Sequence, residues 1–142
     1  MTEAFARYMA IDYGEKRVGL AISDPIGMIA SPAGFILRRA GKRPPVAELV
    51  RRAEALEAKG FLIGLPLDGS GNETDRTREV RAVGAELEKR TGLPVRYLDE
   101  RYTTSAALRT VRAMGGSTRG RKGDVDSMSA AILLQQLLDM PE

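Results

Sequence analysis

The order of apolar and polar stretches along the chain predicts three strands near its start. Residues 8–12 form a short apolar run that ends in an acid, and residues 18–23 form a second run after a turn, so the two indicate a hairpin that bends at Gly14. Residues 28–37 form a third extended stretch that contains Pro32. Because proline cannot donate a ladder hydrogen bond, this stretch is expected to be an edge strand.

Helical and strand patterns alternate along the rest of the chain. In residues 44–59 apolar side chains recur at helical spacing after two prolines, and Gly60 is expected to close that helix. Residues 61–65 are apolar without a break, which is typical of a strand buried on both faces. The further elements expected are a helix over 73–91 stopped by Gly92, a strand over 95–98, a helix from Thr103 or Thr104 to Met114, a basic glycine-rich loop over 115–123 and a last helix over 124–140. Together these elements indicate an α/β fold with a mixed sheet and helices on both of its faces.

Length and composition fit one globular domain that spans residues 1–142. The 142 residues are 43% hydrophobic and 29% charged, and the sequence contains no repeat and no linker long enough to divide it. No apolar run is long enough to cross a bilayer, and residues 1–10 lack the apolar core of a secretory signal. We therefore expect a cytoplasmic protein without a membrane partner.

The residue types that are missing exclude several kinds of chemistry. The sequence contains neither Cys nor His. Disulfides, zinc fingers, thiol nucleophiles and histidine bases are therefore excluded. Hydrolytic chemistry would have to depend on carboxylates with hard cations bound through oxygen, or on Lys, Tyr, Ser and Arg.

Positive charges gather in two zones, although the net charge of the whole chain is only +3. Residues 38–52 contain five arginines and one lysine against a single acid, and residues 109–122 contain basic residues and no acid. Most of these are arginines, whose guanidinium group can bind two phosphate oxygens at once. The zones indicate a polyanionic partner such as nucleic acid, with an ordinary solvated surface as the alternative.

Acidic residues stand at three places where the predicted elements meet. They are Asp12, Asp99 with Glu100, and Asp124 with Asp126. An acid at the end of a strand can face the crevice where α/β sheets bind ligands, or it can simply organise a turn. Because side chains alternate along a strand and turn about 200° over two helical positions, only one of each pair is expected to point inward. Asp124 suits a helix N-cap, which leaves Asp126 free to turn toward the sheet.

Three carboxylates in one crevice would repel one another unless cations neutralise them. Such an arrangement would bind Mg²⁺ or Mn²⁺. Two ions about 4 Å apart can activate a water and stabilise the leaving oxygen of a phosphodiester, and this reaction needs no histidine. The basic zones would then hold the nucleic-acid backbone beside the acidic centre.

Four motifs in chain order resemble those of one known family. They are Ile11-Asp12-Tyr13-Gly14 with Arg17-Val18-Gly19, then Ile63-Gly64-Leu65-Pro66-Leu67, then Asp99-Glu100-Arg101 with Thr103-Thr104, and finally Lys122-Gly123 with Val125-Asp126-Ser127. From about residue 10 to residue 138 the chain resembles the YqgF-type pre-16S rRNA nucleases. These proteins are also called Holliday-junction-resolvase-like and are similar to ribonuclease H in fold. The resemblance implies a five-stranded mixed sheet, its first three strands antiparallel, flanked by helices and carrying an acidic metal site.

The resemblance also implies which residues act. Asp12, Glu100 and Asp126 would be the catalytic residues and the ligands of Mg²⁺ or Mn²⁺. Asp124 departs from the family pattern, so which of Asp124 and Asp126 binds metal stays open. Asp68 stands where an amide is familiar; it could be an extra ligand, although a role as a loop residue fits it better.

Basic and aromatic residues near the motifs are candidates for contact with the nucleic acid. The basic ones are Arg17, Arg101, Arg119, Arg121 and Lys122. Arg101 could contact a phosphate or pair with Asp99, and Lys122 could hold the backbone or be a solvated loop residue. Phe35, Tyr97 and Tyr102 could stack on bases, but with only 5% aromatic residues the chain is not built around stacking platforms.

The first functional hypothesis is a metal-dependent nuclease for structured nucleic acid, with the 5′ end of precursor 16S rRNA as the substrate that the resemblance implies. A Holliday junction resolvase acting on branched DNA is the alternative, and it would favour a two-fold homodimer over a monomer. Two further hypotheses are a non-catalytic nucleic-acid-binding module and a phosphotransfer enzyme. The phosphotransfer hypothesis follows because the strand-Asp-x-Gly hairpin also resembles the phosphate-binding element of actin-like ATPases, although those need two such domains.

Overall fold

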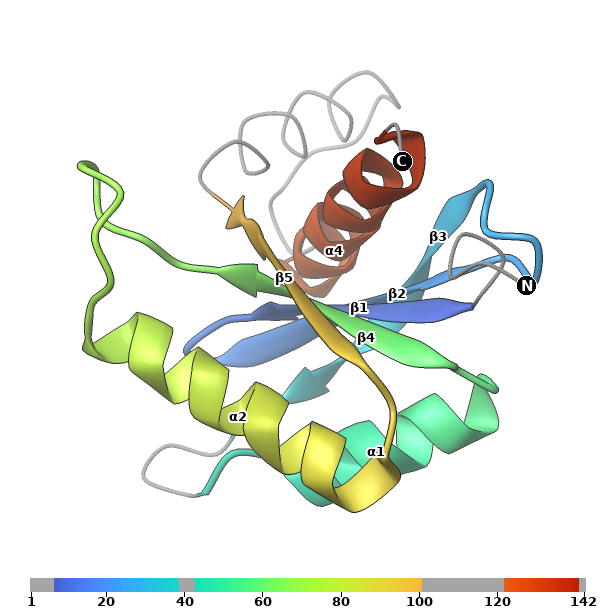
Figure 1. Cartoon of the computed structure of the whole chain (residues 1–142), viewed down its shortest axis with the longest axis horizontal. Coiled ribbons are helices and arrows are strands. Elements are labelled where there is room, and N and C mark those ends of the chain that lie inside the picture. The colour runs from blue at the N-terminus through green and yellow to red at the C-terminus, as the bar shows by residue number, and fades with distance from the viewer. Residues whose placement is uncertain (1–6, 39–42, 101–121, 141–142) are drawn as a thin grey trace.

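A computed structural model of the chain describes residues 7–38, 43–100 and 122–140 (Figure 1). Five strands form a single sheet in the order β3-β2-β1-β4-β5. The strands are β1 (Tyr8–Tyr13), β2 (Arg17–Ser23), β3 (Ala30–Leu37), β4 (Gly60–Leu65) and β5 (Val95–Asp99). β1, β2 and β3 pair antiparallel, whereas β4 pairs parallel with both β1 and β5. The five-stranded mixed sheet and the edge position of β3 are both confirmed.

Helices cover both faces of this sheet, as the sequence predicts. α1 (Val46–Ala55) and α2 (Asp75–Thr91) lie on one face, and α4 (Lys122–Asp139) crosses the other (Figure 1). Apolar side chains of β1, β2 and β4 alternate between a cluster under α1 and α2 and a smaller cluster under α4. Because successive strand side chains point to opposite faces, this alternation makes β4 the strand buried on both sides that its unbroken apolar sequence indicates.

The end of α1 differs from the prediction. The helix stops at Ala55 and not near Lys59, and Gly60 is already the first residue of β4. Glu57 takes a positive φ of 57°, and the amide of Ala58 donates to the carbonyl of Ala53 at 2.9 Å. This is the hydrogen-bond pattern that closes many helices, although a glycine usually occupies the left-handed position. The helix therefore ends at a glutamate that the sequence pattern did not mark.

The other helix ends agree more closely with the sequence. Thr74 caps α2 by accepting a hydrogen bond from the amide of Thr77, and Gly92 stops the helix with a φ of 70°. α4 begins at Lys122, two residues before the predicted start. Asp124 therefore lies inside the first turn, and its predicted role as the N-cap is wrong. None of the described helices is long and apolar enough to span a membrane.

Candidate active site

Asp12 lies near the end of β1 between two glycines on the neighbouring strands. It pairs directly with Gly19 of β2, and because Ile11 pairs with Ile63 of β4, Gly64 comes alongside Asp12 on the other side. Residues at the same level of adjacent strands point to the same face of a sheet. Asp12 therefore has no neighbouring side chain on either flank, and both gaps open on the face that α4 covers.

The side chain of Glu100 lies in the gap at Gly64. Glu100 directly follows β5, and its carboxylate lies over the β4 backbone: a Cβ added to Gly64 would come within 2.9 Å of Glu100 Oε2 and 3.1 Å of Leu133 Cδ2. The carboxyl groups of Asp12 and Glu100 are hydrogen-bonded to each other. The glycine in the second sequence motif is thus needed for space, since a larger residue would displace Glu100 from Asp12.

The gap at Gly19 brings α4 close to the sheet. A Cβ on Gly19 would overlap the backbone carbonyl of Asp126 and lie 2.9 Å from the Asp126 Cβ. Asp126 Oδ2 accepts a 2.8 Å hydrogen bond from Arg17 Nε, and Ser127 Oγ donates to the carbonyl of Leu20 at 3.0 Å. These contacts fix the first turns of α4 over β2, so that the charge of Asp126 acts on Asp12 from the side opposite Glu100.

The environment of Asp12 and Glu100 favours their protonated forms when no cation is bound. Burial is the largest cause and raises the pKa of Asp12 from 3.8 to about 6, with a further rise from the charge of Asp126. Burial, followed by the charge of Asp12, raises the pKa of Glu100 from 4.5 to about 8. Two carboxyl groups that share a proton in this way form a set of oxygen donors to which a hard divalent cation could bind in place of the proton.

Asp126 differs from Asp12 and Glu100 in its hydrogen-bond partner. Its carboxylate is engaged with Arg17, and within the described residues no group of three or more acidic side chains is arranged to hold a metal ion. The structure therefore joins Asp12 and Glu100 directly and places Asp126 next to them as an electrostatic neighbour. That all three bind metal stays a prediction.

Arg76 belongs to this site, although no motif or spacing in the sequence selects it. It lies in the first turn of α2, where its Nη2 donates to the carbonyl of Tyr13 at 3.1 Å and its Nη1 pairs with Glu15 at 3.1 Å. Its positive charge lowers the pKa of both Asp12 and Glu100. A single arginine on an amphipathic helix carries no signal in the sequence; only the packing of α2 against the β1–β2 turn reveals its position.

A cationic pocket of about 300 Å³ opens beside the acidic pair. Three positively charged side chains and two acids line it, namely Lys16, Arg17, Arg76, Glu15 and Asp126, with Gly14 at the turn. Gly14 donates its amide to the carbonyl of Arg17 at 3.0 Å, which keeps the hairpin tight at this point. Positive charge next to buried carboxylates is the arrangement expected where a phosphate group lies against bound cations.

Comparison with known proteins identifies the family. A family model described as "RuvX: Holliday junction resolvase" matches residues 6–140. The chain belongs to the RuvX family. Two relatives, from Koribacter versatilis and Maridesulfovibrio salexigens, are each 39% identical to it and carry the name "Putative pre-16S rRNA nuclease". The matches cover 94% and 93% of this chain and 86% and 97% of the relatives.

Solved structures agree with this RuvX assignment at the level of the fold. Thermus thermophilus RuvC has a TM-score of 0.57 at 13% identity, over 89% of this chain and 92% of that one. The human cytomegalovirus terminase nuclease domain has a TM-score of 0.55 at 11% identity, over 96% of this chain and 85% of that one. The ribonuclease H-like sheet predicted from the motifs is therefore confirmed.

The remaining predicted residues of this RuvX-family chain divide into three groups. Arg17 lines the cationic pocket, as expected of a residue near the substrate. Arg101, Arg119 and Arg121 lie outside the described residues, as do the side chains of Lys122 and Asp124. Asp68 accepts hydrogen bonds from the amides of Ser70 and Asn72, both at 2.9 Å, so it organises its own loop.

Two other sequence expectations change in the folded protein. In the basic zone over 38–52, Arg38 pairs with Glu79, while Arg51 and Arg52 share Glu48, so two acids offset two of these three positive charges within the protein. Tyr97 packs against the cluster under α1 and α2, with Arg81 over its ring at 5.2 Å, so it is not a free stacking platform. Tyr102 lies outside the described residues.

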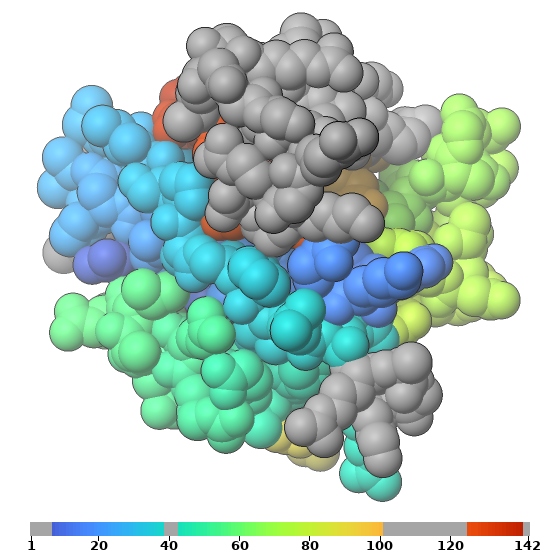
Figure 2. All heavy atoms as spheres, turned by 180° about the vertical axis from the view of Figure 1, so that it is seen from behind, coloured from blue at the N-terminus to red at the C-terminus, as the bar shows by residue number. Residues whose placement is uncertain are grey.

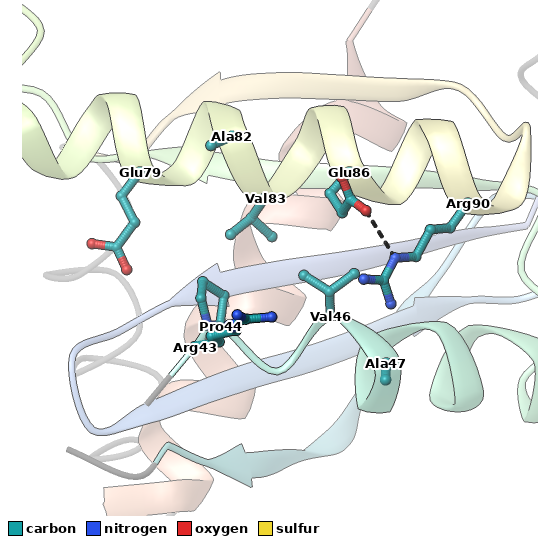
Figure 3. A pocket seen from close by; sticks show the side chains of 9 residues that line it. All are labelled: Arg43, Pro44, Val46, Ala47, Glu79, Ala82, Val83, Glu86 and Arg90. Carbon is teal, nitrogen blue, oxygen red and sulfur yellow. Dashed lines mark hydrogen bonds and ion pairs between the residues drawn. The ribbon is translucent and has the colours of Figure 1, made fainter. Parts of the chain in front are cut away.

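A second pocket lies on the opposite side of the sheet. It has a volume of about 340 Å³ between the start of α1 and the middle of α2, and its floor includes Val46 and Val83 (Figure 3). At its rim Glu86 pairs with Arg90 at 3.0 Å. The two buried carboxyl groups with raised pKa values, Asp12 and Glu100, lie at the other site, which places the candidate chemistry on the α4 side.

Proposed function

We propose that the protein is a divalent-metal-dependent nuclease that hydrolyses phosphodiester bonds in structured nucleic acid, with the 5′ end of precursor 16S rRNA as its substrate. The observation that carries this proposal is the hydrogen-bonded pair Asp12 and Glu100, buried beside a pocket lined by Lys16, Arg17 and Arg76. Both the description of the family and the names of the relatives are those of nucleic-acid-cleaving proteins. The names of the relatives favour precursor rRNA over branched DNA.

In this proposal the carboxylates of Asp12 and Glu100 would hold Mg²⁺ or Mn²⁺, and Asp126, which pairs with Arg17 in this structure, would be the third ligand. A bound divalent cation supplies an activated water and stabilises charge on the leaving oxygen. The site contains no histidine that could do this instead, since the chain has none. Burial of the two carboxyl groups then becomes useful, because charge interactions are stronger where water is excluded.

The basic side chains of the pocket position the substrate. Arg76 and Lys16 place positive charge beside the acids, where they can bind the phosphate next to the one that is cleaved. Arg17 has a double role in the proposal: it holds Asp126 in the protein without substrate and binds phosphate when Asp126 turns to the cation. In this proposal the enzyme acts in the cytoplasm, and the basic residues Arg101, Arg119, Arg121 and Lys122 also bind the nucleic-acid backbone.

The test is cleavage of a precursor 16S rRNA fragment in the presence of Mg²⁺ or Mn²⁺. Asp12→Asn and Glu100→Gln should each reduce the rate by about 10²- to 10³-fold, the range seen when a group that stabilises transition-state charge is lost. Glu86→Gln, which changes an acid on the far face of α2, should leave the rate unchanged and serves as the matched control. Full activity in both active-site variants would reject the proposal.

A resolvase is the second candidate, because the family description names Holliday junctions. A resolvase should cut synthetic four-way junctions symmetrically on two strands, and it should do so as a homodimer. Sedimentation of the purified protein, together with parallel assays on a four-way junction and on precursor rRNA at equal salt, separates the two candidates. Preferred cleavage of the junction by a dimer would transfer the assignment to DNA recombination.

A further inference from the structure

Two apolar side chains of β3 are exposed next to the active site. Phe35 is 38% exposed and Leu37 is 68% exposed, while Ile36 between them is buried in the cluster under α1 and α2. Since side chains alternate along a strand, Phe35 and Leu37 point to the other face of the sheet, the one that carries Asp12. Large exposed apolar side chains at adjacent positions of one face commonly mark a binding surface.

Strand pairing places these side chains in line with the acids. Phe35 pairs with Gly19, which in turn pairs with Asp12, and Leu37 pairs with Arg17. Two strand spacings separate Phe35 from Asp12, which is about 10 Å. In Figure 2 the cyan atoms of β3 lie beside the blue atoms of the β1–β2 turn, and Leu37 pairs with Arg17, which lines the cationic pocket.

Three backbone positions of β3 have no amide free for a partner strand. The amide of Ala30 donates to Gln135 Oε1 at 2.9 Å, the amide of Gly34 donates to Ser127 Oγ at 3.3 Å, and Pro32 has no amide hydrogen. A positive φ of 87° at Gly34 accompanies a shift of register that further interrupts the edge. Addition of a strand from another protein is therefore a poor use of this surface.

We propose that Phe35 and Leu37 bind unpaired bases of the substrate near the scissile phosphate. The inference rests on the proposed nuclease function and specifies its substrate class: a segment that is single-stranded beside the cleavage site. A nucleotide chain presents phosphates on one side and base faces on the other, which matches a pocket of Lys16, Arg17 and Arg76 beside two apolar side chains. Because the first turn of α4 lies over Gly19, between Phe35 and Asp12, the nucleotide chain would reach the acids from Phe35 past Leu37 and Arg17.

A base-paired segment cannot use this surface in the same way. In a duplex the faces of the bases are stacked on their neighbours, so an aromatic ring reaches them only after they are splayed apart. Stacking on Phe35 accepts any base, because every base has a flat aromatic face. The surface therefore selects unpaired over paired substrate without reading a sequence.

The experiment compares binding of a fluorescently labelled single-stranded RNA with binding of the same RNA in a blunt duplex. Anisotropy is measured with Ca²⁺ in place of Mg²⁺ or Mn²⁺ to suppress cleavage. The double variant Phe35→Ala with Leu37→Ala should bind the single strand at least tenfold more weakly and the duplex unchanged, a loss in the range measured for one stacked base. Phe35→Trp, which keeps a flat aromatic ring, should bind the single strand as the natural protein does.

A matched control comes from the other end of the same hairpin. Met28 and Ile29 are 63% and 62% exposed, and they lie in the turn between β2 and β3, away from the row that contains Asp12. The double variant Met28→Ala with Ile29→Ala should keep the affinity for both RNAs. Thermal unfolding of each variant verifies that all of them fold.

Two results would overturn the inference. The first is an unchanged affinity for the single strand in the Phe35 and Leu37 variant, or an equal loss for the duplex. The second is conversion of a dimer to a monomer by that variant in sedimentation, which would make the surface a contact between two copies of the chain. Failure of the nuclease function would appear differently, as cleavage that persists in Asp12→Asn while the preference for single strands is intact.

Discussion

The sheet has one face covered by α1 and α2 and another crossed by α4, and the two are built from side chains of different size. Under α1 and α2 lie large residues such as Phe61, Leu49 and Leu87, all fully buried. Under α4 half of the eight buried residues in the described part of the chain are alanines, Ala10 and Ala21 from the strands and Ala130 and Ala131 from the helix, beside larger residues such as Leu62 and Leu133. The first face stabilises the fold by burying area, whereas the second lets a helix approach the strands closely.

This difference explains where the acids are found. Asp12 and Glu100 meet only because Gly64 leaves room between them, and Asp126 reaches the same place because Gly19 lets the α4 backbone come down onto β2. Buried carboxyl groups reduce stability, so a face that carries them contributes less to the fold than one filled with hydrocarbon. One face of the sheet therefore mainly stabilises the fold, and the other mainly holds the acids.

The largest expected loss of stability comes from a substitution on the face covered by α1 and α2. Phe61→Ala should lower the free energy of unfolding by about 3–5 kcal/mol, because it removes a fully buried ring and leaves a cavity. Chemical denaturation measures this loss. At a temperature where the variant is folded, its rate of RNA cleavage should be normal; a large loss of rate would show that the two faces do not act separately.

The acidic pair should make the stability of the metal-free protein fall as pH rises. Both folded-state pKa values lie above their ordinary values, so the folded state binds protons more tightly than the unfolded state between about pH 4 and pH 8. The free energy of unfolding should therefore decrease over that window, by about 3 kcal/mol for Asp12 alone at ~1.4 kcal/mol for each pKa unit.

Denaturation curves at pH 4 and pH 8 measure this decrease. Asp12→Asn removes one of the two titrating groups and should flatten the dependence, whereas Glu86→Gln on α2 should not. Addition of Mn²⁺ at pH 8 should stabilise the natural protein and have little effect on Asp12→Asn, since only the former keeps the carboxylate pair. If the free energy of unfolding depended on pH equally in the natural protein and in Asp12→Asn, Asp12 would not be one of the titrating groups.

On the α4 face, a single added methyl group should reduce both stability and cleavage. Gly19→Ala places a Cβ in the position of the Asp126 carbonyl, so α4 must shift, at a cost of about 1–3 kcal/mol. The shift moves Asp126 away from Asp12, and cleavage should fall more than stability alone explains. Gly69→Ala is the matched control, because a Cβ there meets no atom within 4 Å. Equal activity of the two variants would show that the close approach of α4 is not needed.

The smallest effect is expected from an exposed ion pair on the other face. Glu86→Gln removes the pair with Arg90 on the surface of α2 and should change the free energy of unfolding by less than about 0.5 kcal/mol, since surface pairs contribute little. Arg17→Ala removes the half-buried pair with Asp126 and should cost more, because it links β2 to α4. If the two variants lost similar amounts of unfolding free energy, the pair between Arg17 and Asp126 would not hold α4 in place.

Much of the fold follows from local patterns that the sequence shows directly. The β1–β2 hairpin, the edge position of β3, the buried β4 and the ends of α2 agree with the prediction because each depends on nearby residues such as Gly14, Pro32 and Gly92. The end of α1 was placed wrongly because Glu57 adopts a left-handed conformation that its residue type does not announce.

The candidate site was predicted in part. Asp12 and Glu100 are at the ends of β1 and β5, where the alternation of side chains and the family motifs place them. The cationic neighbour Arg76 was missed, and Tyr97 was offered as a stacking residue although it packs against the core. In both cases the position depends on how α2 lies against the sheet, which no local pattern records.

The sequence by itself determined the alternation of strands and helices, the restriction to carboxylate chemistry and the four motifs, because hydrophobic period, composition and residue order are properties of the chain. Only the tertiary structure decided that two glycines flank Asp12, that Glu100 bonds to it while Asp126 turns to Arg17, and that Phe35 lies in the same row. These facts concern residues up to 109 positions apart. Their proximity arises from strand register and helix packing, which are fixed only when the whole sheet is assembled.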